Sequence, residues 1–177
     1  MAPTTAPSPS APGTTAPGPI ALTDVERDAV ALALAAGFAG PVADLPPAAH
    51  RRWWRVMATD AFDAWLIDWP TEASVHPHDH GGSAASIAVV RGGLSEVLLA
   101  GEHADTTDLG PGVVHRVAED AVHDISNPGP ARATSVHVYS PPLRTMVFYD
   151  DRGRPLRQDD VDPEPVLWSA ELPTPAS

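Results

Sequence analysis

Before residue 53 the apolar positions follow a helical spacing. The string Thr23-Asp24-Val25-Glu26 is a capping box, in which the Thr and Glu side chains satisfy backbone N–H groups at a helix start. The apolar residues after it predict a helix of about 15 residues that ends between Gly37 and Gly40. A second, short helical stretch is expected from Pro46-Pro47 to Trp53-Trp54.

From Trp53 onward the pattern changes to short apolar runs separated by turn residues such as Gly92-Gly93. Many short strands at close, even spacing predict an antiparallel sandwich or barrel. Strands are expected at 53–58, 64–69, 74–80, 86–90, 95–100, 106–109, 112–117, 121–125, 134–139 and 145–149. We therefore expect a mainly β fold, a jelly-roll barrel preceded by N-terminal helices.

The two ends of the chain differ in composition from its middle. Residues 1–21 carry no charged side chain and consist largely of Ala, Pro, Thr, Ser and Gly, so we expect a disordered arm. Residues 22–177 are expected to form one domain, because roughly 150 residues can bury a core without disulfides. The stretch 161–177 is Pro-rich, and Trp168 is expected to pack against the barrel.

Charge and composition exclude several classes of protein. The formal net charge is −12, from 23 acids and 11 bases, all of them Arg. This balance argues against a nucleic acid or an anionic membrane surface as partner. Without Lys there is no Schiff base and no Walker-type phosphate loop, and without Cys no disulfide or Cys nucleophile. No membrane-length apolar run or signal-peptide pattern is present, so we expect a cytoplasmic protein and a monomer.

Histidines gather in the string His76-Pro77-His78-Asp79-His80. Alternate strand residues lie on one face about 6.6 Å apart, so His78 and His80 can bind one cation together, with His76 one step further out. A surface turn that is His-rich by chance is the alternative. A third ligand is expected from His123, which opens a His-x-x-x-Asn segment, and His115 in a Gly-x-x-His pattern is its rival.

These segments resemble the two metal motifs of the cupin family, a β-barrel fold. Many cupins carry a Glu ligand after the second His, and Ala84 and Ala85 stand there instead. Three neutral imidazoles leave a divalent charge unneutralised and favour an anionic ligand such as a thiolate. The string Ser135-Val136-His137-Val138-Tyr139-Ser140-Pro141-Pro142 is similar to the signature of the cysteine dioxygenase family, the thiol-oxidising branch of the cupins. The resemblance covers about residues 53–149.

The resemblance implies an iron(II) enzyme that adds both atoms of dioxygen to the sulfur of L-cysteine and gives cysteine sulfinic acid. His78, His80 and His123 would hold the iron. Alternation puts Ser135, His137 and Tyr139 on one strand face, where His137 and Tyr139 match the pair beside the metal and Ser135 extends the relay. Ser140-Pro141 matches a cis peptide bond of the family.

One position departs from the family pattern, and the position of the carboxylate anchor stays open between two arginines. In animal members a Cys crosslinks to the tyrosine; Ala85 stands at that place, so Tyr139 acts as a free phenol. The carboxylate anchor of the family, an Arg on an early strand, falls on Arg55 or Arg52, with Arg55 the better fit to the motif.

Three other functions stay open at this point. The first is a dioxygenase for another small thiol such as 3-mercaptopropionate, whose enzymes carry Gln at the anchor position. The second is a metal-binding cupin without redox activity, and the third is a structural β-barrel.

Overall fold

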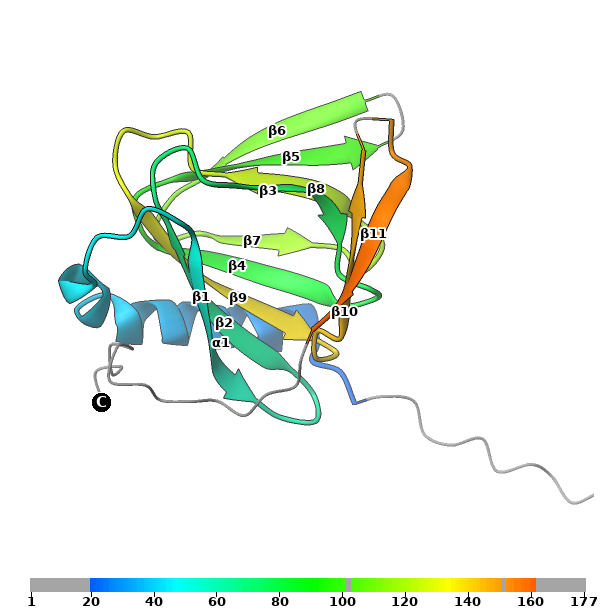
Figure 1. Ribbon diagram of the computed structural model, residues 1–177. Helices are drawn as coiled ribbons and strands as arrows, with labels where there is room; N and C mark the ends of the chain where they lie inside the picture. Colours follow the sequence, from blue (N-terminus) through cyan, green and yellow to red (C-terminus); the bar gives the residue numbers. More distant parts are fainter. Residues whose placement is uncertain (1–19, 101–102, 151, 162–177) are drawn as a thin grey trace, which may run out of the picture.

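Two antiparallel β-sheets face each other, and one helix covers the outer surface of the lower sheet (Figure 1). The computed structural model describes residues 20–100, 103–150 and 152–161. Within them the strands are β1 (Arg52–Ala58), β2 (Asp63–Trp69), β3 (Ser74–Asp79), β4 (Ala84–Arg91), β5 (Leu94–Ala100), β6 (His103–Leu109), β7 (Val114–Val117), β8 (Val122–Ser126), β9 (Ala133–Ser140), β10 (Thr145–Tyr149) and β11 (Pro155–Asp160). The predicted mainly β architecture is confirmed.

The strand order shows how distant parts of the chain meet. One sheet has the order β1-β2-β9-β4-β7, and the other has the order β11-β10-β3-β8-β5-β6. In the second sheet β3 pairs with β8, and in the first sheet β9 lies between β2 and β4. The histidine-bearing strands β3 and β8 are therefore neighbours on one sheet, and they face β9 on the other (Figure 1).

The predicted helix is α1 (Asp24–Phe38), and its capping box is present. The Thr23 hydroxyl accepts a hydrogen bond from the Glu26 N–H at 3.4 Å, and the Glu26 carboxylate accepts one from the Thr23 N–H at 2.8 Å. The helix packs against β4 and β9. Its buried Arg27 donates from Nε to the Ser86 hydroxyl at 3.1 Å.

The short helix expected after Pro46-Pro47 is absent, whereas the strand expected at 53–58 is confirmed as β1. A short 3₁₀ helix, η1 (Pro41–Asp44), precedes that stretch, and β1 begins at Arg52. Trp53 and Trp54 have high strand propensity, and both pair with β2, where Trp54 lies opposite Leu66. At these two residues, where a helix end and a strand start were both expected, pairing with β2 favours the strand.

Strand β11 escaped the sequence analysis because every residue in it is exposed. It carries no apolar alternation, and it forms through its hydrogen bonds to β10 at the edge of the sheet, with Gln158 opposite Val147. An edge strand of this kind has no pattern that a hydrophobic reading can detect.

Two apolar clusters hold the layers together. The cluster between the sheets includes Trp69, Ile87 and Ile125, and the cluster under the helix includes Phe38 and Val136. Every residue of β9 is buried, because one of its faces meets the helix and the other faces the interior of the sandwich. A polar residue on the inner face of β9 is therefore held in a dry, closely packed place.

Three predictions about the chain ends concern residues that the structure largely leaves out. Residues 1–19 of the predicted disordered arm lie outside the described residues, as does Trp168, so these predictions and the boundary of the domain at residue 22 stay predictions. Within the described residues, no helix has the length and apolar content needed to cross a membrane.

Candidate metal centre

Strand pairing brings three histidines to one point. His78 on β3 lies directly opposite His123 on β8. His80 follows at the end of β3, just before the turn Gly81-Gly82. Gly81 has φ +57°, and a Cβ there would overlap Oγ1 of Thr145 and approach its backbone carbonyl. Only glycine fits this close approach, which fixes the turn that carries His80.

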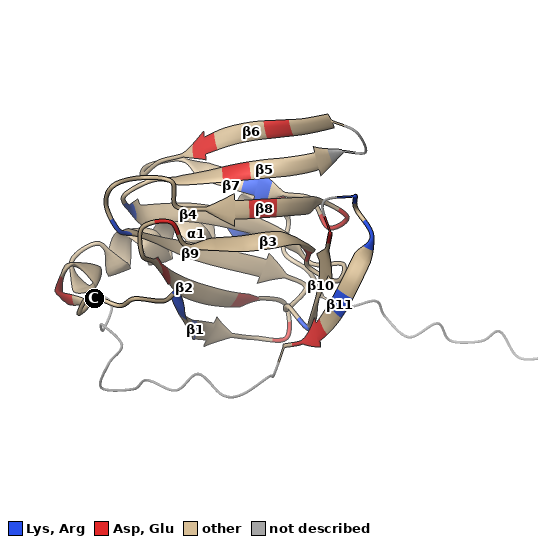
Figure 2. Cartoon of the chain, turned by 45° about the horizontal axis from the view of Figure 1, so that its top comes forward, with Lys and Arg blue, Asp and Glu red and all other residues tan. Residues whose placement is uncertain are grey.

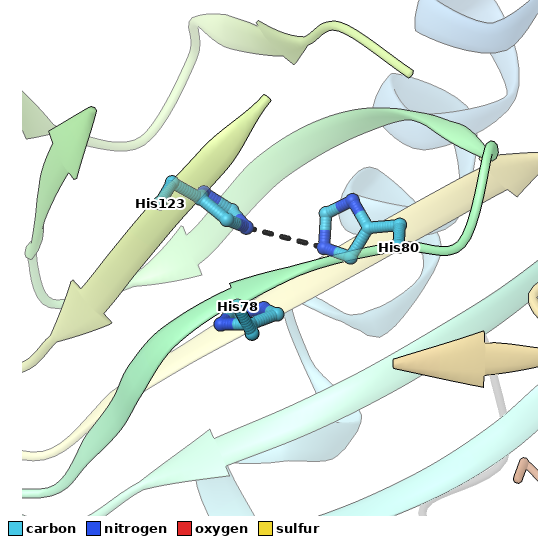
Figure 3. A group of neighbouring side chains, drawn as sticks. All are labelled: His78, His80 and His123. Carbon is cyan, nitrogen blue, oxygen red and sulfur yellow. Dashed lines mark hydrogen bonds between the residues drawn. The ribbon is translucent and has the colours of Figure 1, made fainter. Parts of the chain in front are cut away.

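The imidazoles of His78, His80 and His123 point toward one another (Figure 3). Each ring offers a nitrogen within 4.8 Å of the nitrogens of the other two. Nε2 of His80 lies 3.1 Å from Nε2 of His123. All three side chains are buried, with exposed fractions of 4%, 1% and 0%.

Hydrogen bonds orient two of the rings. Nδ1 of His78 donates to the backbone carbonyl of His76 at 2.9 Å, and Nδ1 of His123 donates to Oε1 of Glu96 at 2.6 Å. A carbonyl and a carboxylate can only accept, so each ring keeps the lone pair of its Nε2. This is the arrangement in which proteins hold a metal-binding imidazole. Nδ1 of His80 is buried and has no hydrogen-bond partner among the described residues.

Burial keeps His78 and His80 neutral. It lowers the pKa of His78 from 6.5 to about 3, and it holds the pKa of His80 well below its usual value, with the charge of His123 acting in the same direction. Glu96 is charged: burial opposes ionisation, but hydrogen bonds from His115 and His123 outweigh it and lower its pKa. Neutral imidazoles are the form that binds metal ions.

The rival ligand His115 lies behind the cluster. Its Nε2 pairs with Oε2 of Glu96, while His123 holds the other oxygen of that carboxylate. Glu96 therefore separates His115 from the histidine cluster. His123, and not His115, lies where the three rings meet. Glu96 connects the two histidines.

The expectation that His76 shares the face of His78 is wrong. A bulge between Val75 and His78 changes the alternation, so Val75 and His78 are buried while the side chain of His76 is exposed. His76 contributes only its carbonyl oxygen, which accepts the hydrogen bond from His78.

A hydrogen-bonded row lies on the inner face of β9. Nε1 of Trp69 donates to the Ser135 hydroxyl at 2.9 Å, and that hydroxyl lies 2.9 Å from Nε2 of His137. Nδ1 of His137 lies 3.3 Å from the hydroxyl of Tyr139. The ring of Tyr139 then contacts the ring of His80, with centroids 4.9 Å apart. The row thus runs from Trp69 to the edge of the histidine cluster.

Burial also decides the protonation of this row. It lowers the pKa of His137 from 6.5 to about 3. Burial and the negative charge of Asp63 together raise the pKa of Tyr139 above its ordinary value. At neutral pH the row is therefore a neutral imidazole beside a protonated phenol. The Ser140–Pro141 peptide bond that follows is cis, as predicted.

The two candidate arginines lie on opposite sides of β1. Arg55 lines the cavity and forms an ion pair with Asp63 at 3.1 Å, and Asp63 is fully buried. Arg52 pairs with buried Asp68 at 3.1 Å and stacks on Trp54, and it does not line the cavity. A third arginine, Arg51, lines the cavity beside Trp53 and Trp69.

A cavity of about 590 Å³ opens between the sheets next to the cluster. Its lining includes His78, His123, His137 and Tyr139, and aromatic side chains form much of the rest. Arg157, Asp159 and Asp160 of β11 lie at this cavity, so both signs of charge occur on that strand (Figure 2). The volume lies within the usual range for small-molecule sites.

Sequence reasoning assigned no role in the site to Glu96, Asp63 or Arg51. Glu96 has a local signal, because an acid two positions after Leu94 occupies an inward position of an apolar strand. Arg51 also has a local signal, because it alternates with Trp53 and Arg55 along the chain. The partners of all three come from other strands, which the sequence alone does not place.

These residues fit a divalent transition metal. Imidazole suits iron, zinc, copper and nickel alike. His78, His80 and His123 are buried, and the hydrogen bonds of Nδ1 in His78 and His123 leave Nε2 as the ligand atom of these two rings. The nearby charged carboxylate of Glu96 partly compensates a cation. The donor set alone does not select one of these metals.

Comparison with known proteins agrees with this geometry. An oxalate oxidase in complex with the substrate analogue glycolate superposes with a TM-score of 0.50 at 15% identity, covering 59% of this chain and 58% of that one. A cupin superfamily protein from Desulfitobacterium hafniense DCB-2 superposes with a TM-score of 0.48 at 18% identity, covering 56% of this chain and 87% of that one. The likeness to the oxalate oxidase shows a shared fold.

The sequence comparison goes further than the fold. A family model, Cysteine dioxygenase type I, matches residues 44–152, which include the histidine cluster and the row on β9. Because this match covers more than half of the 177 residues, the chain belongs to the cysteine dioxygenase type I family.

Proposed function

We propose that this protein is a non-heme iron(II) thiol dioxygenase that adds both atoms of dioxygen to the sulfur of L-cysteine and gives cysteine sulfinic acid. The observation that carries the proposal is the cluster of three buried imidazoles beside a cavity lined by arginines. Within the described residues no carboxylate joins the three imidazoles. A divalent ion held by imidazoles alone has no anionic ligand, so it prefers to bind an anionic thiolate.

His78, His80 and His123 would hold the iron. When bound, iron(II) supplies a positive, redox-active centre that lowers the pKa of a bound thiol and brings the thiol and dioxygen together. Glu96 would fix the ring of His123 and keep its Nδ1 protonated, so that Nε2 presents its lone pair. The pairing with His115 holds Glu96 in place.

Ser135, His137 and Tyr139 would position one hydroxyl beside the reacting atoms. Trp69 can only donate, so Ser135 accepts from it and is free to donate to Nε2 of His137. Nδ1 of His137 then donates to the oxygen of Tyr139, which leaves the phenol hydrogen for a bound ligand. The high pKa of Tyr139 keeps that hydrogen in place.

Arg55 would contact the carboxylate of the substrate. It lines the cavity, and its ion pair with Asp63 fixes its planar guanidinium. A planar group of this kind can donate two parallel hydrogen bonds to a carboxylate. A cytoplasmic location, a monomeric state, and partners limited to a small thiol and dioxygen complete the proposal.

The direct test is oxygen uptake by the iron(II)-loaded protein with L-cysteine, with the product identified by mass spectrometry. With ¹⁸O₂, both heavy atoms should appear in the sulfinate. The variant His78→Ala should lose activity, whereas His103→Ala, an exposed histidine outside the cluster, should keep it. Equal activity of the His78 variant would refute the assignment.

Two other experimental outcomes would change the proposed function. Faster turnover of 3-mercaptopropionate than of L-cysteine would move the substrate to that thiol. Tight binding of zinc without any oxygen uptake in the iron form would favour a metal-binding cupin without redox activity.

A further inference from the structure

His80 differs from the other two histidines of the cluster in how its ring is oriented. Nδ1 of His78 and Nδ1 of His123 each donate a hydrogen bond that fixes the ring. Nδ1 of His80 is buried and has no such partner among the described residues. The direction of the His80 ring therefore depends on the backbone that carries it and on packing against its neighbours.

The backbone after His80 is a turn with little rigidity of its own. Two glycines follow the histidine, Gly81 with φ +57° and Gly82 with φ +88°. Glycine restricts the backbone less than other residues do, so such a turn needs further contacts to keep one conformation. The Ser83 N–H donates to the His80 carbonyl at 3.2 Å, and the Gly81 N–H donates to Oδ1 of Asp79 at 2.8 Å. The Asp79 side chain is thus an anchor of the turn.

Tyr149 of β10 holds the carboxylate of Asp79. Its hydroxyl donates to Oδ2 of Asp79 at 2.5 Å, so each oxygen of the carboxylate accepts one hydrogen bond. Strands β3 and β10 are antiparallel neighbours in which Asp79 lies opposite Val147, and Tyr149 is the diagonal neighbour on the same face. The hydrogen bond raises the pKa of Tyr149, because its phenolate would face a carboxylate, so the hydroxyl remains a donor.

Asp79 itself does not reach the point where the rings meet. It alternates with His78 and His80 along the strand, so its side chain lies on the other face of β3. Both of its oxygens are engaged away from the cluster, by the turn and by Tyr149. It therefore acts on the cluster through the backbone that carries His80.

We propose that Tyr149 is a positioning residue, which holds the His80 ring at the metal through Asp79. Tyr149 does for His80, by way of the backbone, what Glu96 does for His123 by a direct hydrogen bond. Its neighbour Phe148 contacts the ring of His78, with centroids 5.8 Å apart, so β10 supports both histidines of β3. The inference rests on the proposed function only for the role of the cluster as a metal site.

The test compares Tyr149→Phe, which removes one oxygen and keeps the ring, with Asp79→Ala and with the double variant. Asp150→Ala is the matched control, because its carboxylate also accepts hydrogen bonds from backbone N–H groups of a turn but lies outside the cluster. Competition with a chelator measures the zinc affinity of each protein. Nuclear magnetic resonance of ¹⁵N-labelled histidine side chains in the zinc-loaded protein reports on each ring separately.

Tyr149→Phe should weaken zinc binding by roughly three- to tenfold, less than the roughly 10- to 100-fold usual for a direct partner of a ligand. It should shift the ring signals of His80 by more than those of His123. Loss of the hydroxyl leaves the Asp79 charge less compensated, which alone would attract a cation more strongly, so a lower affinity reports a change in geometry.

The other variants show whether Tyr149 acts through Asp79. Asp79→Ala should cost more affinity than Tyr149→Phe, because it also leaves the Gly81 N–H without its acceptor. The double variant should bind zinc no more weakly than Asp79→Ala alone, since the two residues act as one unit. Asp150→Ala should bind zinc as the wild type does.

Four results would overturn the inference. They are wild-type zinc affinity and His80 signals in Tyr149→Phe, additive losses in the double variant, an equal loss in Asp150→Ala, and failure of the wild type to bind zinc. If the expected zinc results appear but the iron(II) form consumes no oxygen, the proposed function fails and the role of Tyr149 stands. If the enzyme oxidises L-cysteine but Tyr149→Phe keeps wild-type zinc affinity and His80 signals, only the role of Tyr149 fails.

Discussion

Ala85 lies directly opposite Tyr139 in the antiparallel pair of β4 and β9. Opposed residues of such a pair share one face, with their Cβ atoms about 5 Å apart. Ala85 is fully buried, and Tyr139 is nearly so. The methyl group of Ala85 therefore occupies the place next to the phenol from which a cysteine could reach its ring.

Ala85→Cys should permit a thioether between the new sulfur and the ring of Tyr139. With iron(II), L-cysteine and dioxygen, the protein should lose two hydrogen atoms, whose electrons pass to dioxygen. Mass spectrometry of the peptides would detect the linked pair. The double variant Ala85→Cys, Tyr139→Phe serves as the control and should keep a free thiol. A free thiol in the single variant after many turnovers would contradict the expected approach of the two side chains.

Glu96→Gln should weaken metal binding by roughly 10- to 100-fold, the usual effect of losing a partner of a metal-bound histidine. The neutral amide no longer compensates the charge of the ion or fixes the proton on Nδ1 of His123. Competition with a chelator measures the affinity. His115→Gln should cost less, because it touches Glu96 and not the cluster. Unchanged affinity of the Glu96 variant would show that the carboxylate is not needed to hold His123.

His137 should make the stability of the metal-free protein depend on pH. Burial lowers its pKa from 6.5 to about 3, so between these values the unfolded chain binds a proton that the folded chain does not. Its contribution is present above pH 6.5 and is lost as the pH falls toward 3. The loss is about 1.4 kcal/mol per pH unit.

Urea unfolding of the wild type and of His137→Gln at pH 7 and pH 5 isolates this effect. The difference between the two free energies of unfolding should shrink by about 2 kcal/mol over that range, because almost all of the loss occurs below pH 6.5. The same difference at both pH values would mean that His137 is not buried in its neutral form.

Gly81→Ala should lower the free energy of unfolding by at least about 1 kcal/mol, the cost of a left-handed backbone for a residue with a Cβ. The close approach to Thr145 adds to this cost and should displace His80, so metal affinity should fall as well. Gly40→Ala is the control, since a Cβ there meets nothing within 4 Å and no positive φ is required. Wild-type stability and metal affinity of the Gly81 variant would contradict the role of this turn.

Local patterns in the sequence determined much of this protein. The capping box at Thr23 placed the helix, and apolar alternation placed ten of the strands. The spacing of His78 and His80, together with the string that contains His137 and Tyr139, pointed to the site. The residues of each pair are two positions apart on the same stretch of chain, so a local sequence pattern shows that they lie close together.

Only the tertiary structure decided the rest. It placed His123 opposite His78, Glu96 between His123 and His115, Asp63 against Arg55, and Arg51 over Trp69. A bulge in β3 moved His76 to the surface, and pairing with β2 made Trp53 and Trp54 part of β1 rather than the end of a helix. Each of these depends on strand register or on contacts between strands far apart in the chain, and no local spacing encodes which strand becomes a neighbour.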